Sequence, residues 1–595
     1  MNNRALPLTQ EKISVPFQHT DNNEKSRYPV PDRAGTNVYL DDTDFQQLLK
    51  IYMPAKLLTH LQPHLTRLGE LAGAELDELA RQADSNPPTL QHRTRDGRDK
   101  QSILKHPSYV EMERLAFSEF GLAALSHKSG VLGWETKMPA VAKYAMTFLF
   151  VQAEFGLCCP LSMTDSLTRT LVKYGSPQLI SRYFEDLTSQ DLDTLSQGAM
   201  FMTEQGAGSD IAATETLAQN DPKDPQAWLL SGDKWFCSNP DAALAMVLAR
   251  HEGGPEGMKG VSLFLLPRTL PDGRDNRIEI VRLKDKLGTR SMASGEIRLR
   301  GAKAWLVGEL GRGFVQMADM VNNSRLSNGM RAAGLMRRAV GEALYISKHR
   351  KAFGASLIDM PLMRPQLSKM MLSAEQARTV MFQAAEALRR SDAGEEGAYA
   401  LTRLLTPLLK FRACRDARKV TGDALEVRGG CGYIEEWSDP RILRDAHLGS
   451  VWEGTSNIVA LDVIRAIKRE GSLPIWNLHL DQLIKESKWH PQALYQLAQA
   501  RVRVNSLIDS VVNNTEHEEV TRQVASSMYR VTAVVAMAWE ATQYESIRRM
   551  TLAQLGLIHQ LSVQDPLKAR VQPDLTCLFE ESQSKGRVET VNLFN

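Results

Sequence analysis

The chain has 595 residues, of which 43% are hydrophobic and 24% are charged, and its formal net charge is +2. This length allows three or four domains of roughly 100–200 residues each, and the composition is that of an ordinary soluble globular protein. The near-neutral charge excludes a bulk electrostatic attraction to nucleic acid or to a membrane surface. No run of about 18 consecutive apolar residues occurs, so no membrane-spanning helix is predicted.

Residues 1–40 are polar and rich in Pro and Asn, which predicts a flexible N-terminal arm. The segment lacks the apolar core of a signal peptide, and its acidic residues are untypical of an Arg-rich transit peptide. We therefore expect a cytoplasmic protein.

The cysteines show no metal-ligand spacing. The six cysteines form no Cys-x-x-Cys pair and no His/Cys cluster. They are Cys158, Cys159, Cys237, Cys414, Cys431 and Cys577. We expect free thiols in a reducing compartment and no bound metal ion.

Residues 41–198 show the periodicity of helices. The segments QQLLKIYMPAKLLTHLQPHLTRLGELAG and AVAKYAMTFLFVQAEFG repeat their apolar residues with a period of about 3.6. The stretch SNPPTLQHRTRDGR, rich in turn-forming residues, interrupts the pattern. This part of the chain is predicted to be an N-terminal helical domain.

Residues 199–312 have a different pattern of apolar and polar residues. Short apolar or alternating segments, separated by Gly, Pro and Asp, read AWLLSGDKWFCSN, AALAMVLARHE, GVSLFLLPR, IEIVRL and GEIRLRGAKAWLV. Such a pattern is typical of strands joined by turns. We predict a small central β-barrel or β-sandwich domain.

Helical periodicity returns in residues 313–470, with breaks at AFGASLIDMP and RGGCGYIEEW, and predicts a C-terminal bundle of four or five helices. Residues 471–595 are predicted to be an appended helical domain. Its apolar stretch VTAVVAMAWEA must be covered, either by another subunit or by a neighbouring part of the same chain. The predicted fold class is therefore α+β and multidomain, in the order helical, β, helical, helical.

Six motifs lie in a fixed order along the central part of the chain. They are MTEQGAGSD (202–210), GDKWFCSN (232–239), KLGTRSMAS (286–294), HRKAFG (349–354), EVRGGCGY (426–433) and RDAHLGSVWEGTSNI (444–458). In this order they resemble the flavin-dependent acyl-CoA dehydrogenases. The segments SNPPTL, HPSY, LKDKLGTRS, DMPLMR and TPLLKF, together with the extra C-terminal helices, resemble the bacterial alkylation-response (AidB-like) branch of that family. The resemblance implies the acyl-CoA dehydrogenase fold.

The resemblance also implies a reaction, the α,β-dehydrogenation of an acyl-CoA thioester, with Glu453 as the base and hydride transfer to flavin N5. From the residues alone, Glu453 precedes a helical run that Thr455, Ser456 or Asn457 can cap. A carboxylate there can simply complement the helix dipole, which contributes about 0.3–1 kcal/mol. A role as base requires that burial raise its pKa towards the working pH.

Non-covalent binding of FAD is implied as well. The cofactor-binding positions of the family correspond here to Met202, Thr203, Ser209, Phe236, Ser238, Arg350, Phe353, Glu426, Gly429, Gly430, Thr455 and Asn457. In the family, the arginine and phenylalanine of the motif HRKAFG reach the FAD of a neighbouring subunit, which implies a homo-oligomer, a tetramer. The positions that correspond to acyl-CoA contacts are Ser209, Arg325, Trp452 and Gly454.

Plainer readings of these residues stay open. The GAGS segment can be a simple tight turn, Arg350 a solvated charge at a helix end, and Arg325 a charge on a helix surface. The chain also departs from the family, which favours Gln where Pro361 and Glu426 stand. The contacts at the adenine end of FAD are therefore open.

Three functions are compatible with the sequence. The first is an FAD-dependent acyl-CoA dehydrogenase. An electron-transfer partner is compatible with this function. The second is an alkylation-response flavoprotein, associated with DNA or detoxifying, and the third is a non-catalytic acyl-CoA or fatty-acyl binding protein. Basic and acidic residues nearly balance in the appended domain, which removes the simple electrostatic argument for DNA without excluding a local patch.

Overall fold

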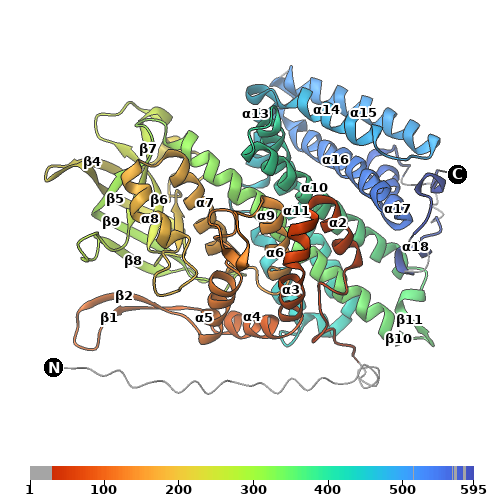
Figure 1. Ribbon diagram of the computed structural model, residues 1–595, viewed down its shortest axis with the longest axis horizontal. Coiled ribbons are helices and arrows are strands. Elements are labelled where there is room, and N and C mark those ends of the chain that lie inside the picture. Colours follow the sequence, from red (N-terminus) through yellow and green to blue (C-terminus); the bar gives the residue numbers. More distant parts are fainter. Residues whose placement is uncertain (1–29, 514, 566, 568–572, 581–584, 595) are drawn as a thin grey trace.

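The computed structural model describes residues 30–513, 515–565, 567, 573–580 and 585–594. It is an elongated molecule with a β domain at one end and helices over the rest (Figure 1). Of the predicted flexible arm 1–40, residues 1–29 lie outside the described residues, whereas the remainder packs against helix α3 (Ala55–Gly73). Val38 and Tyr39 are buried, and the Gly35 N–H donates to the Gly73 carbonyl at 2.8 Å.

Two glycines on the surface of α3 explain why this segment packs there although its composition is polar. An added Cβ at Gly73 would lie 1.7 Å from the Thr36 carbonyl oxygen, and one at Gly69 would lie 2.4 Å from the Tyr39 side chain. The two glycines therefore let the chain lie directly on α3, a feature that composition does not reveal.

Helices dominate the first part of the described chain. They are α2 (Thr43–Tyr52), α3 (Ala55–Gly73), α4 (Glu75–Ser85), α5 (Pro107–Glu113), α6 (Ala140–Phe150), α7 (Cys158–Tyr174) and α8 (Pro177–Leu187). The break between the periodic segments is a hairpin of β1 (Thr89–Arg93) and β2 (Asp99–Leu104), which the periodicity did not predict. Its Gln101 carbonyl accepts a hydrogen bond from Arg268 at 2.7 Å, so the hairpin reaches the β domain.

The central domain is a small barrel. Its strands are β3 (Gly198–Phe201), β4 (Leu217–Asp221), β5 (Asp224–Ser238), β6 (Leu244–His251), β7 (Val261–Pro267), β8 (Ile278–Leu283) and β9 (Ser294–Leu306). The ladder runs β6–β4–β5–β9–β7, and β7 pairs back with β6, which closes the barrel; β3 adds beside β6 and β8 beside β9. The strands predicted within 224–306 are confirmed, whereas the short β3 and β4 were not predicted.

Long helices form the bundle that follows. They are α9 (Gly313–His349), α10 (Met363–Asp392), α11 (Ala398–Arg428), α12 (Ser438–Leu448) and α13 (Ser456–Glu470). Between α9 and α10 lies a short hairpin of β10 (Lys351–Ala352) and β11 (Ala355–Ser356). A 3-10 helix, η6 (Gly429–Tyr433), follows α11.

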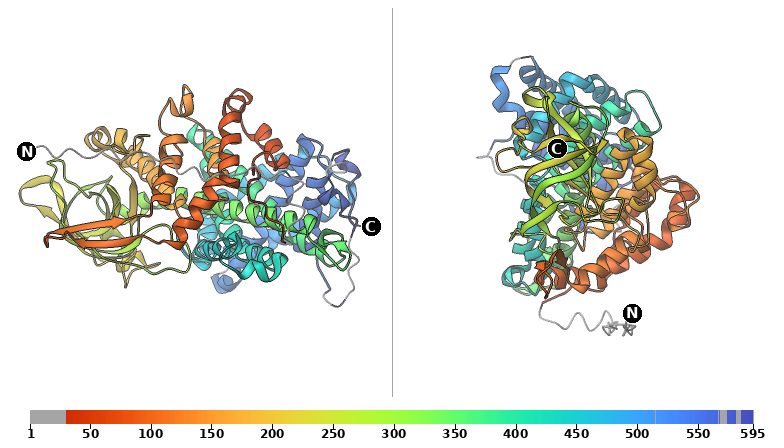
Figure 2. Two further views of the ribbon diagram at one scale, coloured as in Figure 1. Left: turned by 90° about the horizontal axis from the view of Figure 1, so that it is seen from below. Right: turned by 90° about the vertical axis from the view of Figure 1, so that its left-hand side faces the viewer.

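The appended domain continues the bundle at the end opposite the barrel (Figure 2). Its helices are α14 (Ser472–Lys485), α15 (Pro491–Val512), α16 (Thr521–Gln543), α17 (Ile547–Gly556) and α18 (Thr576–Phe579). Helix α16 carries the apolar stretch and packs on α10 and α11, so this face is covered by the same chain rather than by another subunit. Within it, the buried Glu540 accepts hydrogen bonds from Tyr52 of α2 at 2.7 Å and from Thr379 of α10 at 2.8 Å.

Candidate active site

A buried ion pair holds the loop 202–210 on the barrel. Glu204 accepts hydrogen bonds from Lys234 Nζ at 2.6 Å, from Thr216 Oγ1 at 2.6 Å and from the Glu215 N–H at 2.7 Å. Burial opposes ionisation of Glu204, but the Lys234 ammonium and these hydrogen bonds outweigh it and keep the pKa of Glu204 below its usual value. This pair was not predicted, although each partner lies inside one of the motifs.

The pair brings together the residues that were predicted on the loop and on the neighbouring strand. The Thr203 carbonyl accepts the Trp235 N–H at 2.8 Å, so Met202 and Thr203 lie beside the end of β5, where Phe236 and Ser238 follow. Phe236 is 59% exposed, which is unusual for an aromatic ring at the end of a central strand. The barrel thus presents an uncovered apolar ring next to an open loop.

The glycines of this loop leave its backbone accessible. An added Cβ at Gly206 or Gly208 would meet no atom within 4 Å. The loop is also a tight turn, because Glu204 and Ala207 exchange backbone hydrogen bonds of 3.0 and 3.3 Å. The turn and a close approach of a ligand to Ser209 are therefore compatible with each other.

The turn that carries Glu453 has an unusual backbone. Glu453 has a φ of +56° and Gly454 one of +97°, and both values lie in the left-handed region. Arg325 of α9 fixes this turn, because its Nε donates to the Glu453 carbonyl at 2.8 Å while its Nη1 donates to Asp462 of α13 at 2.8 Å. Lys410 of α11 donates to the Gly454 carbonyl. Arg325 is buried, so it is not a charge on a helix surface.

The Glu453 side chain does not cap the following helix. Helix α13 begins at Ser456, and its N-cap residue, Thr455, forms no side-chain capping bond, contrary to the predicted capping. The Glu453 Oε2 atom is shielded from solvent and accepts no hydrogen bond within the described part of the chain. The start of α13, with exposed Thr455 and Asn457, is therefore left open to an anion.

The carboxyl of Glu453 lies in a protected environment, although the residue as a whole is partly exposed. Burial raises the pKa of Glu453, and interactions with Ser324, Arg325 and Arg331 oppose that rise without cancelling it. A carboxyl with a raised pKa and a vacant acceptor oxygen is suited to proton transfer.

Cys159, at the start of α7, connects the barrel residues with Glu453. Its thiol lies near both Ser238 and Glu453, and burial raises the pKa of Cys159, with the Glu453 carboxylate adding to the effect. The end of β5 and the Glu453 turn therefore lie on either side of one residue, and together they outline a single site.

The remaining predicted residues lie elsewhere in the chain. Arg350 Nη1 donates to the Arg428 carbonyl at 2.8 Å, which places it at the turn of Gly429 and Gly430. Phe353 is fully exposed, and Glu426 also lies on the surface. This group adjoins the β10–β11 hairpin, far from the barrel (Figure 1). One chain alone cannot bring it to the loop 202–210.

Asp445 is a further residue that the sequence analysis missed. It lies in the motif RDAHLGSVWEGTSNI and accepts the Thr289 N–H of the motif KLGTRSMAS at 2.6 Å, which ties α12 to the barrel. Burial, with the nearby Asp84 and Glu154 carboxylates, raises the pKa of Asp445 to about 7.

This shift predicts a pH-dependent stability. The folded state holds the Asp445 proton up to about pH 7, whereas an unfolded chain releases it near pH 4, so stability falls as pH rises through this window. The melting temperature of the wild type should fall between about pH 4 and about pH 7, and Asp445→Asn should flatten that slope. Differential scanning fluorimetry across the range measures both. Equal slopes would show that Asp445 titrates normally.

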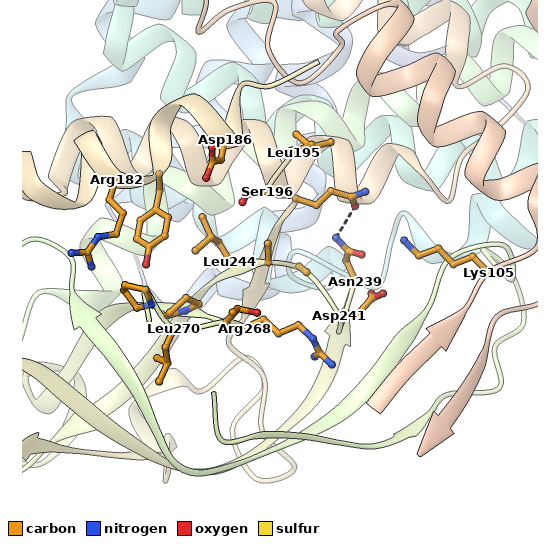
Figure 3. A pocket seen from close by; sticks show the side chains of 17 residues that line it. Lys105, Arg182, Asp186, Leu195, Ser196, Asn239, Asp241, Leu244, Arg268 and Leu270 are labelled. Carbon is orange, nitrogen blue, oxygen red and sulfur yellow. Dashed lines mark hydrogen bonds between the residues drawn. The ribbon is translucent and has the colours of Figure 1, made fainter. Parts of the chain in front are cut away.

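A separate cleft of about 650 Å³ lies between α8 and the barrel. Figure 3 shows Arg182 and Asp186 on its helix side and Arg268 and Asp241 on its strand side. None of the predicted site residues lines it. Among the described residues, no group of three or more His, Cys, Asp or Glu side chains is placed to hold a metal ion, and no helix is both long and apolar enough to cross a membrane.

Comparison with known families accounts for most of the chain. A model of the acyl-CoA dehydrogenase C-terminal domain matches residues 311–468, and a model of the middle domain of that family matches residues 199–302. A model of the adaptive response protein AidB N-terminal domain matches residues 29–194.

Individual relatives agree with these matches. Acyl-CoA dehydrogenase family member 11 of Caenorhabditis elegans is 32% identical over 475 residues, which cover 78% of this chain and 76% of that protein. The putative acyl-CoA dehydrogenase AidB of Escherichia coli (strain K12) is 34% identical over 421 residues, which cover 69% and 74%. The crystal structure of C. elegans ACDH-11 in complex with C11-CoA is similar with a TM-score of 0.82, at 27% identity, covering 92% of this chain and 94% of that one. The chain therefore belongs to the acyl-CoA dehydrogenase family of FAD-binding oxidoreductases, with an N-terminal domain of the AidB type.

Proposed function

We propose that the protein dehydrogenates an acyl-CoA thioester between its α and β carbons and that Glu453 removes the α-proton. The observation that carries this proposal is the Glu453 carboxyl, whose pKa is raised by burial and whose Oε2 atom has no partner within the described residues. A carboxylate that is shielded from solvent and keeps one oxygen without a hydrogen bond is a stronger base than one in water.

The other residues of the turn position this carboxyl. Arg325 and Lys410 hold the carbonyls of Glu453 and Gly454, so the side chain is directed by a fixed backbone. Trp452 stacks on Phe155 with ring centroids 5.9 Å apart and forms an apolar wall beside the base. Such a wall excludes water and suits the alkyl part of a thioester. The complex of the C. elegans relative with C11-CoA supports an acyl-CoA ligand.

The residues present fit FAD. The exposed ring of Phe236 offers a surface for a flat apolar ring, and Met202, Thr203 and Ser238 surround it. The open backbone at Gly206 and Gly208 permits close approach of a ligand. When bound, FAD supplies the acceptor for the hydride that leaves the β-carbon.

The second group of cofactor residues requires a neighbouring subunit. Arg350 and Phe353 lie far from the barrel of their own chain, so they can meet a flavin bound there only across a subunit boundary. The exposed ring of Phe353 and the guanidinium of Arg350 suit the adenine and the pyrophosphate of FAD. We therefore propose a homo-oligomer, a tetramer, in which each FAD is held by two chains.

Removal of Arg350 tests this arrangement. Arg350→Ala is expected to weaken FAD binding by roughly 10–100-fold, because a hydrogen-bonded charge on the pyrophosphate is lost. Fluorescence titration of the apoprotein with FAD measures the effect, and Arg312→Ala, an exposed residue at the start of α9, is the control. Unchanged FAD affinity, or a monomer by light scattering, would contradict the shared site.

The experiment for the function itself is an anaerobic titration of the FAD-loaded protein. Acyl-CoA thioesters of increasing length, including undecanoyl-CoA, are added while flavin absorbance is recorded. Bleaching by at least one thioester supports the proposal. A yellow protein that no thioester bleaches contradicts the proposal and favours an alkylation-response flavoprotein. A colourless protein that takes up no FAD also contradicts it and favours a non-catalytic acyl-binding protein.

Two of the basic residues of the appended domain are not available to DNA. Arg549 is fully buried and pairs with Glu540 and Glu375, and Arg548 pairs with Asp44 of α2. These two cations hold the domain on the bundle and are not part of an exposed basic surface.

A further inference from the structure

A stripe of polar side chains runs along the face of α9 that lies against the Glu453 turn. Ser324, Asn328 and Arg331 follow one another at helical spacing, and all three are buried. Ser324 interacts with the Glu453 carboxyl, the Asn328 amide donates to the Gly449 carbonyl at 3.3 Å, and the Arg331 guanidinium lies 4.6 Å from the Trp452 ring. The wall of the site opposite the turn is therefore polar where an alkyl chain would need an apolar surface.

Several buried polar atoms at this place have no partner. Within the described residues, hydrogen bonds are lacking at Arg331 Nη1, Trp452 Nε1, Glu453 Oε2 and Asn328 Oδ1, each of which is shielded from solvent. Buried polar atoms are normally satisfied, because an unpaired one costs about 1–3 kcal/mol. Unpaired donors and acceptors around one turn indicate the place of a polar ligand group.

Arg331 differs from the other arginines that are buried to the same degree. Arg378, Arg428 and Arg549 each form ion pairs with two carboxylates or more. Arg331 donates only a long hydrogen bond, from Nε to the Ser327 carbonyl at 3.4 Å, and no carboxylate of the described chain lies within ion-pair distance of it. Its other neighbours are the rings of Trp452 and Phe155, at 4.6 and 5.4 Å.

This environment leaves the charge of Arg331 without an ion-pair partner among the described residues, and the Glu453 carboxylate acts on it only at longer range. A guanidinium stays protonated at any physiological pH, and a buried charge is costly unless it is paired. The two aromatic faces compensate it only in part, since such contacts contribute about 0.5–2 kcal/mol. Glu453 does not neutralise it by direct contact, because no ion pair joins the two residues.

We infer that Arg331 determines substrate specificity: it recognises a carboxylate on the acyl group of the thioester, beyond the carbons that react. This inference rests on the proposed function. A carboxylate supplies the missing counter-ion, and its two oxygens match the planar donors of a guanidinium. The unpaired Trp452 Nε1 donor can bind the same carboxylate, because the Arg331 guanidinium lies 4.6 Å from the Trp452 ring. A purely alkyl chain would leave the Arg331 and Trp452 donors unpaired.

The test uses thioesters that are matched in chain length and differ only in a terminal carboxylate. Glutaryl-CoA is compared with pentanoyl-CoA, and adipyl-CoA with hexanoyl-CoA, in anaerobic flavin reduction by the FAD-loaded wild type. The wild type should favour at least one carboxylated thioester by roughly 10–100-fold, measured as the rate constant of flavin reduction divided by the apparent dissociation constant. Arg331→Met should abolish this preference, whatever its effect on the rate with the alkyl thioester through the pKa of Glu453, and Arg331→Lys should retain part of the preference.

Other outcomes overturn the inference. If Arg331→Met slows both members of a pair equally, the residue only supports Trp452. If the wild type shows no preference and Arg331→Met gains activity on longer alkyl thioesters, the residue limits chain length. FAD content and melting temperature establish that the variants are folded.

The failure of the proposed function is distinguishable from these results. If no thioester reduces the flavin, equilibrium binding by calorimetry still compares glutaryl-CoA with pentanoyl-CoA in the wild type and in Arg331→Met. A preference of the wild type for glutaryl-CoA that Arg331→Met removes would then support the inference alone. Equal affinities would contradict it.

Discussion

Glu453→Gln is expected to slow flavin reduction by an acyl-CoA thioester by about 10²–10⁴-fold while FAD stays bound. Glutamine preserves the shape of the side chain but cannot accept the α-proton. The Arg325 and Lys410 contacts go to backbone carbonyls, so the turn itself should be unaffected. Stopped-flow absorbance under anaerobic conditions measures the rate, and the visible spectrum measures FAD content.

The pH dependence of the same reaction provides a second measure. Because burial raises the pKa of Glu453, the basic form increases as pH rises through a value above that of a free glutamate. The reduction rate of the wild type should rise over that range, and Glu453→Gln should lack the rise. An unchanged rate in the variant would mean that another group removes the proton or that none does.

Arg549→Met is expected to destabilise the contact between the appended domain and the bundle by about 3–5 kcal/mol. Arg549 donates to Glu540 at 2.7 Å and to Glu375 at 2.9 Å, and both carboxylates are buried. Methionine fills a similar volume but leaves Glu540 without its cation, whereas Glu375 keeps its ion pair with Arg378. Chemical denaturation followed by circular dichroism measures the loss, and hydrogen exchange shows whether it is confined to α16 and α17.

The matched control is Arg501→Met. Arg501 pairs with Asp481, which is 60% exposed, so its removal should change stability by about 1 kcal/mol or less. Equal effects of the two substitutions would indicate that the network around Glu540 contributes nothing beyond an ordinary surface pair.

Local patterns explain which parts of the fold could be predicted. The longer strands of the barrel alternate or run apolar between turn residues, and the structure contains them. The strands β3 and β4 were not predicted because both are short. Strand β3 also depends on a long-range pairing with β6, whereas β4 pairs mainly with the next strand, β5. Residues 30–40 were predicted to be part of a flexible arm because their composition is polar. Composition does not show that two glycines of α3 leave space for these residues to pack on the helix.

The candidate site shows the same division. The motifs identified the loop 202–210 and Glu453, but not the Lys234–Glu204 pair that holds the loop, because the partners are remote in sequence. Arg331 was overlooked for a different reason. Helix α9 is buried on most of its surface, so its polar residues give a pattern like that of an exposed face, and only the three-dimensional packing shows that they face the turn.

The left-handed backbone at Glu453 has a consequence for engineering. A non-glycine residue at a φ of +56° costs about 1–3 kcal/mol, and glycine adopts that conformation without strain. A library of variants selected only for heat resistance should therefore become enriched in Glu453→Gly. That substitution also removes the carboxylate that acts as the base. Selection for thermal tolerance and selection for turnover would pull this position in opposite directions.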